Sequence, residues 1–143
     1  TTADDAKEAF FRVVPYVDIL FMNTKQDSVN ILEIDSYENI IKRLWDMGIS
    51  TVVLKSAEKQ GYYTGYNGNI NFTSFYTTEC LDTTCSGDAF NGGFLYALTH
   101  GFTEFEAAKF ASIVAGLQAK GIGAIKSIPY RDDVYSIYRG NNG

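Results

Sequence analysis

The sequence predicts an α/β protein in which short buried strands alternate with helices. Residues 17–22 and 49–54 are short, almost wholly apolar runs, a pattern typical of strands covered on both faces. Between them, Ser36 is expected to cap the start of a helix, and Gly48 stands where its C-terminal cap belongs. A strand, a helix and a second strand in this order indicate a parallel unit with a right-handed crossover.

Apolar residues at helical spacing predict the other helices, over residues 3–14, 87–100, 103–119 and 132–139. Thr103 and Glu106 form a capping box at the start of one of them. His100 is interpreted as a cap at the negative end of its helix, with a catalytic role as the alternative. Gly92 and Gly93 each cost about 1 kcal/mol relative to Ala inside a helix, which indicates close packing on a sheet or a ligand.

The middle of the chain predicts a β-hairpin. Residues 61–66 and 69–75 flank Asn67 and Gly68, and an Asn-Gly pair between two such runs is a strong signal for a two-residue turn. Aromatic residues crowd this stretch, at Tyr62, Tyr63, Tyr66, Phe72, Phe75 and Tyr76. We interpret these rings as packing on one face of the hairpin, since sheet propensity alone places aromatics there. The alternative is a stacking platform for a ligand.

Composition limits the classes of protein to consider. The chain has 143 residues, a formal net charge of −5 and 45% hydrophobic residues, which together indicate one packed domain, residues 1–143. An acidic balance without a basic cluster argues against nucleic acid or an anionic membrane as the main partner. No apolar run reaches the length of a spanning helix, and the first residues lack the pattern of a signal peptide. Cys80 and Cys85 are too few for a disulfide scaffold, so a reduced, cytoplasmic protein is expected.

The strongest chemical signal is the segment Asp82-Thr-Thr-Cys-Ser-Gly-Asp88. A helix is expected to start near Gly87, so small side chains lie beside first-turn N–H groups that have no partner within the helix. The helix dipole adds positive potential there, which suits a phosphate or a developing oxyanion. Asp88 lies in the first turn and can accept a proton from a substrate hydroxyl. The alternative is a first-turn Asp that only stabilises the helix, by a few tenths to about 1 kcal/mol.

The same segment, continued through Ala-Phe and Asn-Gly-Gly-Phe-Leu, resembles the C-terminal signature of the PfkB (ribokinase-like) carbohydrate kinases, usually D-T-x-G-A-G-D-x-F-x-x-G. Residues 18–23, 48–55 and 121–129 resemble further segments of that family, in the same order. The resemblance implies a ribokinase-like three-layer α/β/α (Rossmann-like) fold. It also implies that this chain is the C-terminal, nucleotide-binding part, because the family's sugar-binding half lies N-terminal to these segments.

In function, the resemblance implies ATP-dependent transfer of a phosphoryl group to the hydroxyl of a small sugar. Asp88 would be the general base, and the backbone N–H groups of Cys85, Ser86 and Gly87 would form the anion hole. The positions that match nucleotide-binding residues are Asn23, Lys55, Ala57, Thr84 and Gly123. The positions that match a monovalent-cation (K⁺) site are Asp82 and Ser127. Mg²⁺ would arrive with the ATP.

Several positions depart from the family's pattern. The glutamate of its Asn-x-x-Glu is Gln26 here, its Gly-x-x-Gly nucleotide loop reads Ala57-Glu-Lys-Gln60, and the first glycine of its anion-hole loop is Cys85. These departures leave a second interpretation open, a kinase-like module that has lost catalysis and binds a nucleotide or another protein. A third is a relative that phosphorylates a nucleoside or a vitamin. Cys85 can also be interpreted as a reactive thiol at a helix N-terminus.

The resemblance leaves the sugar-binding half of the family unaccounted for. A sheet edge or core face that such a half would cover is expected to favour self-association, so a homo-oligomer is also considered.

Overall fold

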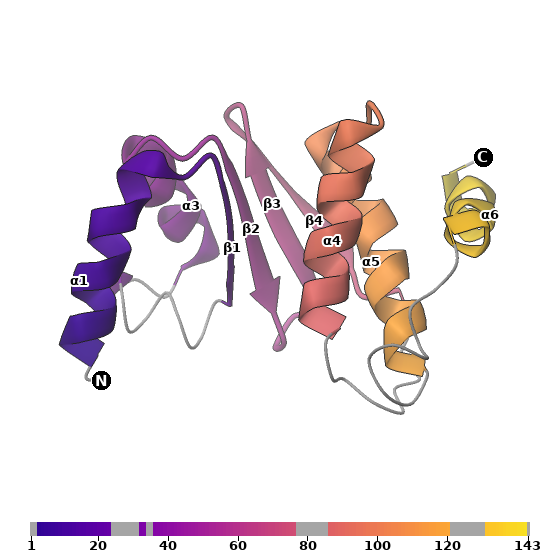
Figure 1. The fold of residues 1–143 in the computed structure, drawn as a ribbon, viewed down its shortest axis with the longest axis horizontal. Helices are drawn as coiled ribbons and strands as arrows, with labels where there is room; N and C mark the ends of the chain where they lie inside the picture. Colours follow the sequence, from indigo (N-terminus) through magenta and orange to yellow (C-terminus); the bar gives the residue numbers. More distant parts are fainter. Residues whose placement is uncertain (1–2, 24–31, 34–35, 77–85, 121–130, 143) are drawn as a thin grey trace. The chain divides into compact units, whose positions relative to one another are not determined.

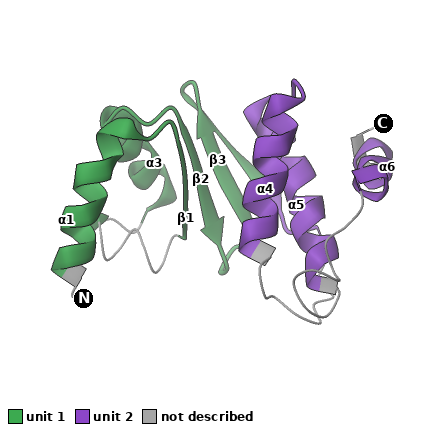
Figure 2. Ribbon diagram, viewed as in Figure 1, with its two compact units in different colours: residues 1–72 green, residues 73–143 purple. Residues whose placement is uncertain are grey.

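The computed structural model describes residues 3–23, 32–33, 36–76, 86–120 and 131–142 (Figure 1). They fall into two compact units, residues 1–72 and 73–143 (Figure 2). The elements before the unit boundary are α1 (Ala3–Val13), the 3₁₀ helix η1 (Val14–Tyr16), β1 (Ile19–Asn23), α3 (Tyr37–Asp46), β2 (Thr51–Ser56) and β3 (Gly61–Tyr66). β4 (Asn69–Ser74) crosses the boundary, and α4 (Ser86–Thr99), α5 (Glu104–Lys120) and α6 (Arg131–Asn142) follow it. The predicted α/β class is confirmed.

The strands form one sheet in the order β1-β2-β3-β4. β1 pairs with β2 in parallel, so the predicted strand–helix–strand unit is confirmed, and β2 pairs with β3 in antiparallel orientation. β2 is buried along nearly its whole length, as the apolar run predicts. β1 starts later than predicted, at Ile19, and only Met22 in it is fully buried. The prediction that both strands are covered on both faces therefore holds for β2 and is wrong for β1.

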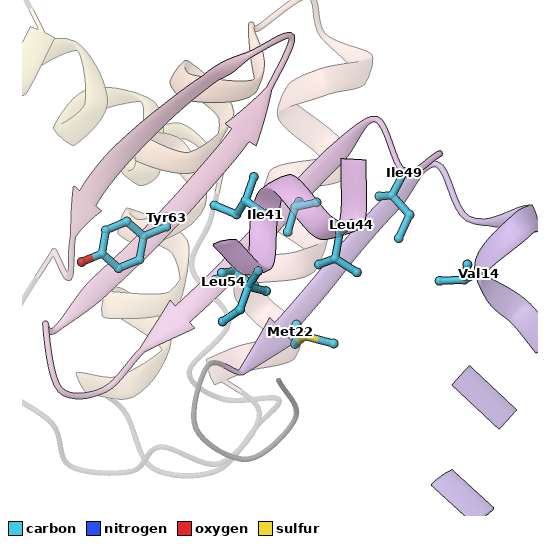
Figure 3. Close-up of a cluster of buried hydrophobic side chains, with 9 residues drawn as sticks. Val14, Met22, Ile41, Leu44, Ile49, Leu54 and Tyr63 are labelled. Carbon is cyan, nitrogen blue, oxygen red and sulfur yellow. The ribbon is translucent and has the colours of Figure 1, made fainter. Parts of the chain in front are cut away.

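The core of the first unit lies between α3 and one face of the sheet (Figure 3). Side chains alternate along a strand, so Met22, Leu54 and Tyr63 all project from this face, toward Ile41 and Leu44 of α3. A close approach of α3 requires glycine in β3. A Cβ built at Gly65 would overlap Ile41 Cγ2 and come within 3.0 Å of Trp45 Cζ2.

The hairpin is confirmed, and of its aromatic residues Tyr62 and Tyr63 are buried, whereas Tyr66 and Phe72 are exposed. Asn67 and Gly68 have φ of 52° and 81°, the left-handed pair that a type I′ turn requires. The Tyr63 ring stacks on Tyr37 at 3.8 Å between centroids and lies 4.9 Å from that of Phe72. Tyr62, the next residue to Tyr63, projects from the opposite face and is also buried. Packing is thus confirmed for Tyr63, but the rings occupy both faces of the hairpin and not one.

The predicted caps lie where the sequence places them. Gly48 has φ of 100°, and its N–H donates to the Trp45 carbonyl at 2.9 Å. Ser36 occupies the N-cap position of α3, although its side chain makes no capping hydrogen bond. In the capping box, the Thr103 N–H donates to Glu106 Oε1 at 3.0 Å and the Glu106 N–H donates to Thr103 Oγ1 at 3.2 Å. The bond that the Thr103 N–H donates to its carboxylate lowers the pKa of Glu106.

In the second unit, α5 packs against α4 and α6. An aromatic cluster joins the three helices, made of Tyr96, Phe102, Phe110, Tyr135 and Tyr138. Within it, the Tyr135 hydroxyl donates to the Tyr96 hydroxyl at 3.4 Å, which raises the pKa of Tyr135. His100 Nδ1 lies 2.8 Å from the Tyr96 carbonyl oxygen, so the prediction that His100 caps α4 is confirmed. α6 is longer than predicted at both ends.

The two adjacent glycines of α4 have different surroundings. A Cβ built at Gly93 would lie 3.0 Å from Val114 Cγ2 and 3.3 Å from Ala111 Cα, both in α5. No atom of the described residues lies within 4 Å of a Cβ built at Gly92. Close packing is therefore confirmed for Gly93, but its neighbour is the helix α5 and not the sheet or ligand that was predicted.

We expect Gly93→Ala to lower the free energy of unfolding by about 1–3 kcal/mol, because α5 must move to admit the methyl group. Gly92→Ala is the matched control and should raise it by up to about 1 kcal/mol through helix propensity alone. Urea denaturation followed by circular dichroism measures both. Equal effects of the two substitutions would contradict the α4–α5 contact.

Candidate functional site

The predicted site residues that the structure describes lie in two places. Asn23, Lys55 and Ala57 lie in the first unit, at and just after the ends of β1 and β2. Ser86, Gly87 and Asp88 form the start of α4 in the second unit. The remaining predicted site residues lie outside the described residues, namely Asp82, Thr84, Cys85, Gly123 and Ser127.

Asn23 and Lys55 are brought together by the parallel register. They are opposite each other at the carboxyl ends of β1 and β2, and both side chains are half-buried. The residues before them, Met22 and Leu54, face α3 in the core. Because side chains alternate, Asn23 and Lys55 project from the other face of the sheet. Ligands of open α/β sheets bind beyond the carboxyl ends of parallel strands, which is where this amide and this amine lie.

Asn23 and Lys55 form a row of side chains across β1 and β2, and Tyr62 on β3 continues that row. Lys55 is opposite Tyr62 in the antiparallel pairing of β2 with β3, so the two side chains share the face from which Asn23 projects. Tyr62 is buried, and burial raises its pKa, so its hydroxyl stays neutral at physiological pH. Nothing in the sequence singles out Tyr62 as a neighbour of Lys55, because Tyr62 stands among other aromatic residues. Only the strand register singles it out.

A tight turn, residues 57–60, connects β2 to β3 beside this row. The Lys59 N–H donates to Oγ of the buried Ser56 at 3.1 Å, and the Gln60 N–H donates to the Ala57 carbonyl at 3.3 Å. Gln60 has φ of 55°, the left-handed region that favours glycine. The turn therefore has a left-handed residue where the PfkB pattern has its second glycine. Ala57, at the pattern's first glycine, is exposed.

The start of α4 offers unpaired backbone donors and one carboxylate. Gly87 and Asp88 are both exposed in the first turn, where N–H groups have no partner within the helix. No atom of the described residues lies within 4 Å of a Cβ built at Gly87. The helix dipole makes this end positive, which favours a bound anion. A carboxyl group beside an anion-accepting helix end provides the groups needed for proton abstraction next to a phosphate.

Neither a cluster of metal ligands nor a membrane-spanning helix is found in the described part of the chain. No three His, Cys, Asp or Glu residues among those described are grouped so that they could hold a metal ion. Nor does any described helix combine the length and apolar character needed to cross a membrane.

The arrangement of the elements and the signature at α4 agree with one family of enzymes. The model of the pfkB family of carbohydrate kinases matches residues 1–131. This chain belongs to the PfkB family.

Relatives and solved structures in this family are longer than this chain. An ATP-dependent 6-phosphofructokinase from Thermoanaerobacterium thermosaccharolyticum is 28% identical over 134 residues, which are 94% of this chain and 41% of the relative. A ribokinase from Thermotoga maritima with a known crystal structure is 26% identical in sequence to this chain. The two structures match with a TM-score of 0.79 over 89% of this chain and 44% of that one. A putative ribokinase II from E. coli, solved in complex with ATP and Mg²⁺, shares the fold at 18% identity, with a TM-score of 0.84 over 96% of this chain and 44% of that one. The predicted ribokinase-like fold is thus confirmed, and the chain spans less than half the length of these proteins.

The left-handed residue in the 57–60 turn predicts opposite effects of glycine at adjacent positions. Gln60→Gly should raise the free energy of unfolding by about 0.5–1 kcal/mol, because it removes a left-handed strain of about 1–2 kcal/mol and adds some unfolded-state freedom. Lys59→Gly, the matched control, only adds conformational freedom to the unfolded state. It should lower the free energy of unfolding by about 0.5–1 kcal/mol. Thermal unfolding compares them, and a loss of stability in both variants would contradict the geometry of the turn.

Proposed function

We propose that this chain carries the phosphoryl-transfer part of an ATP-dependent carbohydrate kinase that acts on a sugar hydroxyl. The observation that carries the proposal is the exposed first turn of α4, where Asp88 and the open backbone of Gly87 lie within the family's signature. Family membership over residues 1–131 supports the reaction class. The identity of the sugar depends on acceptor contacts, none of which the resemblance assigns to this chain.

Asp88 acts as the general base. Its carboxylate accepts the proton of the attacking sugar hydroxyl as the hydroxyl oxygen bonds to the terminal phosphorus of ATP and the bond from that phosphorus to the leaving ADP breaks. The backbone N–H groups of Cys85, Ser86 and Gly87 donate to the oxygens of the transferring phosphoryl group and stabilise the charge there. ATP would supply the phosphoryl group, and Mg²⁺ bound with it would neutralise phosphate charge.

Asn23 and Lys55 bind the phosphates of the nucleotide. Their register at the ends of parallel strands gives one amide donor and one cation side by side, a combination suited to phosphate oxygens. Ala57 and the 57–60 turn border the nucleotide, as do Thr84 and Gly123. Asp82 and Ser127 bind the monovalent cation. These four residues outside the described part are assigned from the resemblance alone.

Two of the departures from the family's pattern, Cys85 and Gln60, are compatible with catalysis, which favours a kinase over the module that has lost catalysis. The anion hole uses backbone N–H groups, which Cys85 retains in place of glycine. Gln60 adopts the left-handed conformation within the turn. Both substitutions are therefore expected to affect stability more than chemistry.

The proposal is tested with a fused polypeptide, in which the part of the T. maritima ribokinase outside its match with this chain is joined to residues 1–143 in the relative's order. A coupled assay of ADP release is run with a panel of sugars. Asp88→Asn should lower kcat by about 10²–10⁴-fold because general-base catalysis is lost. Asp133→Asn, another exposed first-turn Asp at the start of α6, is the matched control and should leave kcat unchanged.

Two results would contradict the proposal. One is full activity in the Asp88→Asn variant, which would remove the general base. The other is no sugar-dependent ADP release from a fused polypeptide that folds and binds Mg·ATP, which would favour the module that has lost catalysis.

A further inference from the structure

Tyr62 is a buried aromatic residue in the row that contains the proposed phosphate-binding pair. It is 5% exposed, and it lies directly opposite Lys55 in the pairing of β2 with β3. Asn23 lies opposite Lys55 on the other side, in the pairing of β1 with β2. Neighbouring strands lie about 4.8 Å apart, and opposite residues of an antiparallel pair have Cβ atoms about 4.5–5.5 Å apart. Lys55 therefore has a close neighbour on each side, one amide and one aromatic ring.

The row of side chains behind Lys55 is filled as well. Two residues earlier on β2, Val53 shares the face of Lys55 and lies opposite Thr64 of β3. Val53 and Thr64 are both buried. Because that space is occupied, the aliphatic stem of Lys55 is directed past the carboxyl end of β2. This is the edge of the sheet beyond which ligands of open α/β sheets bind.

The chemistry of Tyr62 suits a support for an aliphatic stem. Lysine packs its methylene groups along apolar surface and keeps its ammonium in water, and Lys55 is half-buried in agreement with this. Burial raises the pKa of Tyr62, so its hydroxyl stays neutral and adds no negative charge beside the ammonium. An acidic residue at this place would instead compete with a phosphate for the ammonium.

The adjacent Tyr63 is buried too, but it belongs to the hydrophobic core. Its ring projects from the opposite face of the sheet and stacks on that of Tyr37 in α3, at 3.8 Å between centroids. The two adjacent tyrosines therefore differ in their surroundings, which are α3 for Tyr63 and the Lys55 row for Tyr62. This difference makes Tyr63 a matched control for Tyr62.

We infer that Tyr62 is a positioning residue, whose ring supports the stem of Lys55 and holds the ammonium beside Asn23 for the phosphates of a nucleotide. The inference rests on the proposed binding of phosphates by Asn23 and Lys55. It gives Tyr62 no contact with the reacting atoms. The contribution of Tyr62 is pre-organisation, since an ammonium that is already held in place loses less conformational freedom when the nucleotide binds.

The first test is calorimetric titration with Mg·ATP of this chain and its variants, each shown to be folded by circular dichroism. Tyr62→Val should weaken binding by about 3–10-fold, because the lysine side chain must then be ordered during binding. Tyr62→Phe keeps the ring and should bind as tightly as the unaltered chain. Tyr63→Val removes a ring of the same size from the opposite face. It should lower stability and leave the affinity of the folded chain unchanged.

A double-mutant cycle separates this inference from the proposed function. Lys55→Met should weaken binding, and adding Tyr62→Val should then have no further effect, because no ammonium is left to position. Full affinity in Lys55→Met would contradict the proposed role of Lys55. Weak binding in Lys55→Met together with full affinity in Tyr62→Val would overturn the inference alone. So would an equal loss from Tyr62→Val with and without the lysine.

Nuclear magnetic resonance of the unaltered chain decides the question if Tyr62→Val does not fold. A ring packed on the Lys55 stem should shift the methylene resonances of Lys55 away from their random-coil values. It should also give nuclear Overhauser contacts between these methylene groups and the Tyr62 ring before any nucleotide is added. Absence of both signals would overturn the inference, whatever the affinities of the variants.

Discussion

The parallel pairing of β1 with β2 is the interaction on which the first unit depends. Its register places Met22 beside Leu54 on the face that packs under α3, and Asn23 beside Lys55 on the other face. A slip of one residue in either strand would exchange these faces, exposing apolar side chains and burying the amine. The hydrophobic core and the proposed phosphate-binding pair are therefore set by the same backbone hydrogen bonds. Gly65 reinforces this arrangement, because its missing Cβ lets Ile41 and Trp45 of α3 approach the sheet.

In the second unit, the packing contacts of α4 and its proposed catalytic residue lie at different parts of the helix. Gly93 brings α4 close to Ala111 and Val114 of α5, and the aromatic cluster around Tyr96 joins α4 and α5 to α6. These contacts lie in the middle and at the C-terminal end of α4. Its first turn, with Gly87 and Asp88, is left exposed. A rigidly held helix with an open N-terminal end is suited to bind an anion and to keep a carboxylate at a fixed place beside it.

Local signals predicted much of the fold, and tertiary features explain what they missed. The Asn67-Gly68 turn, the Gly48 cap and the Thr103–Glu106 box each depend on a few neighbouring residues, and all three were predicted correctly. The exposure of β1 was not predicted, because the burial of a strand depends on which elements lie beside it. Tyr62 was missed as a neighbour of Lys55, since only the register between strands brings them together. Of the site residues, the sequence predicted the place of Asp88 at a helix start because glycine and small residues mark it. The roles of Asp88 and Lys55 remain predictions from the family's pattern.

Calorimetric titration with Mg·ATP tests most directly whether this chain holds a nucleotide site. The titration is made on this chain and on the fused polypeptide, each shown to be folded by circular dichroism. We expect one saturable binding event, weakened by Lys55→Met, because that substitution removes the cation beside Asn23. Absence of binding heat from both folded polypeptides would contradict the account.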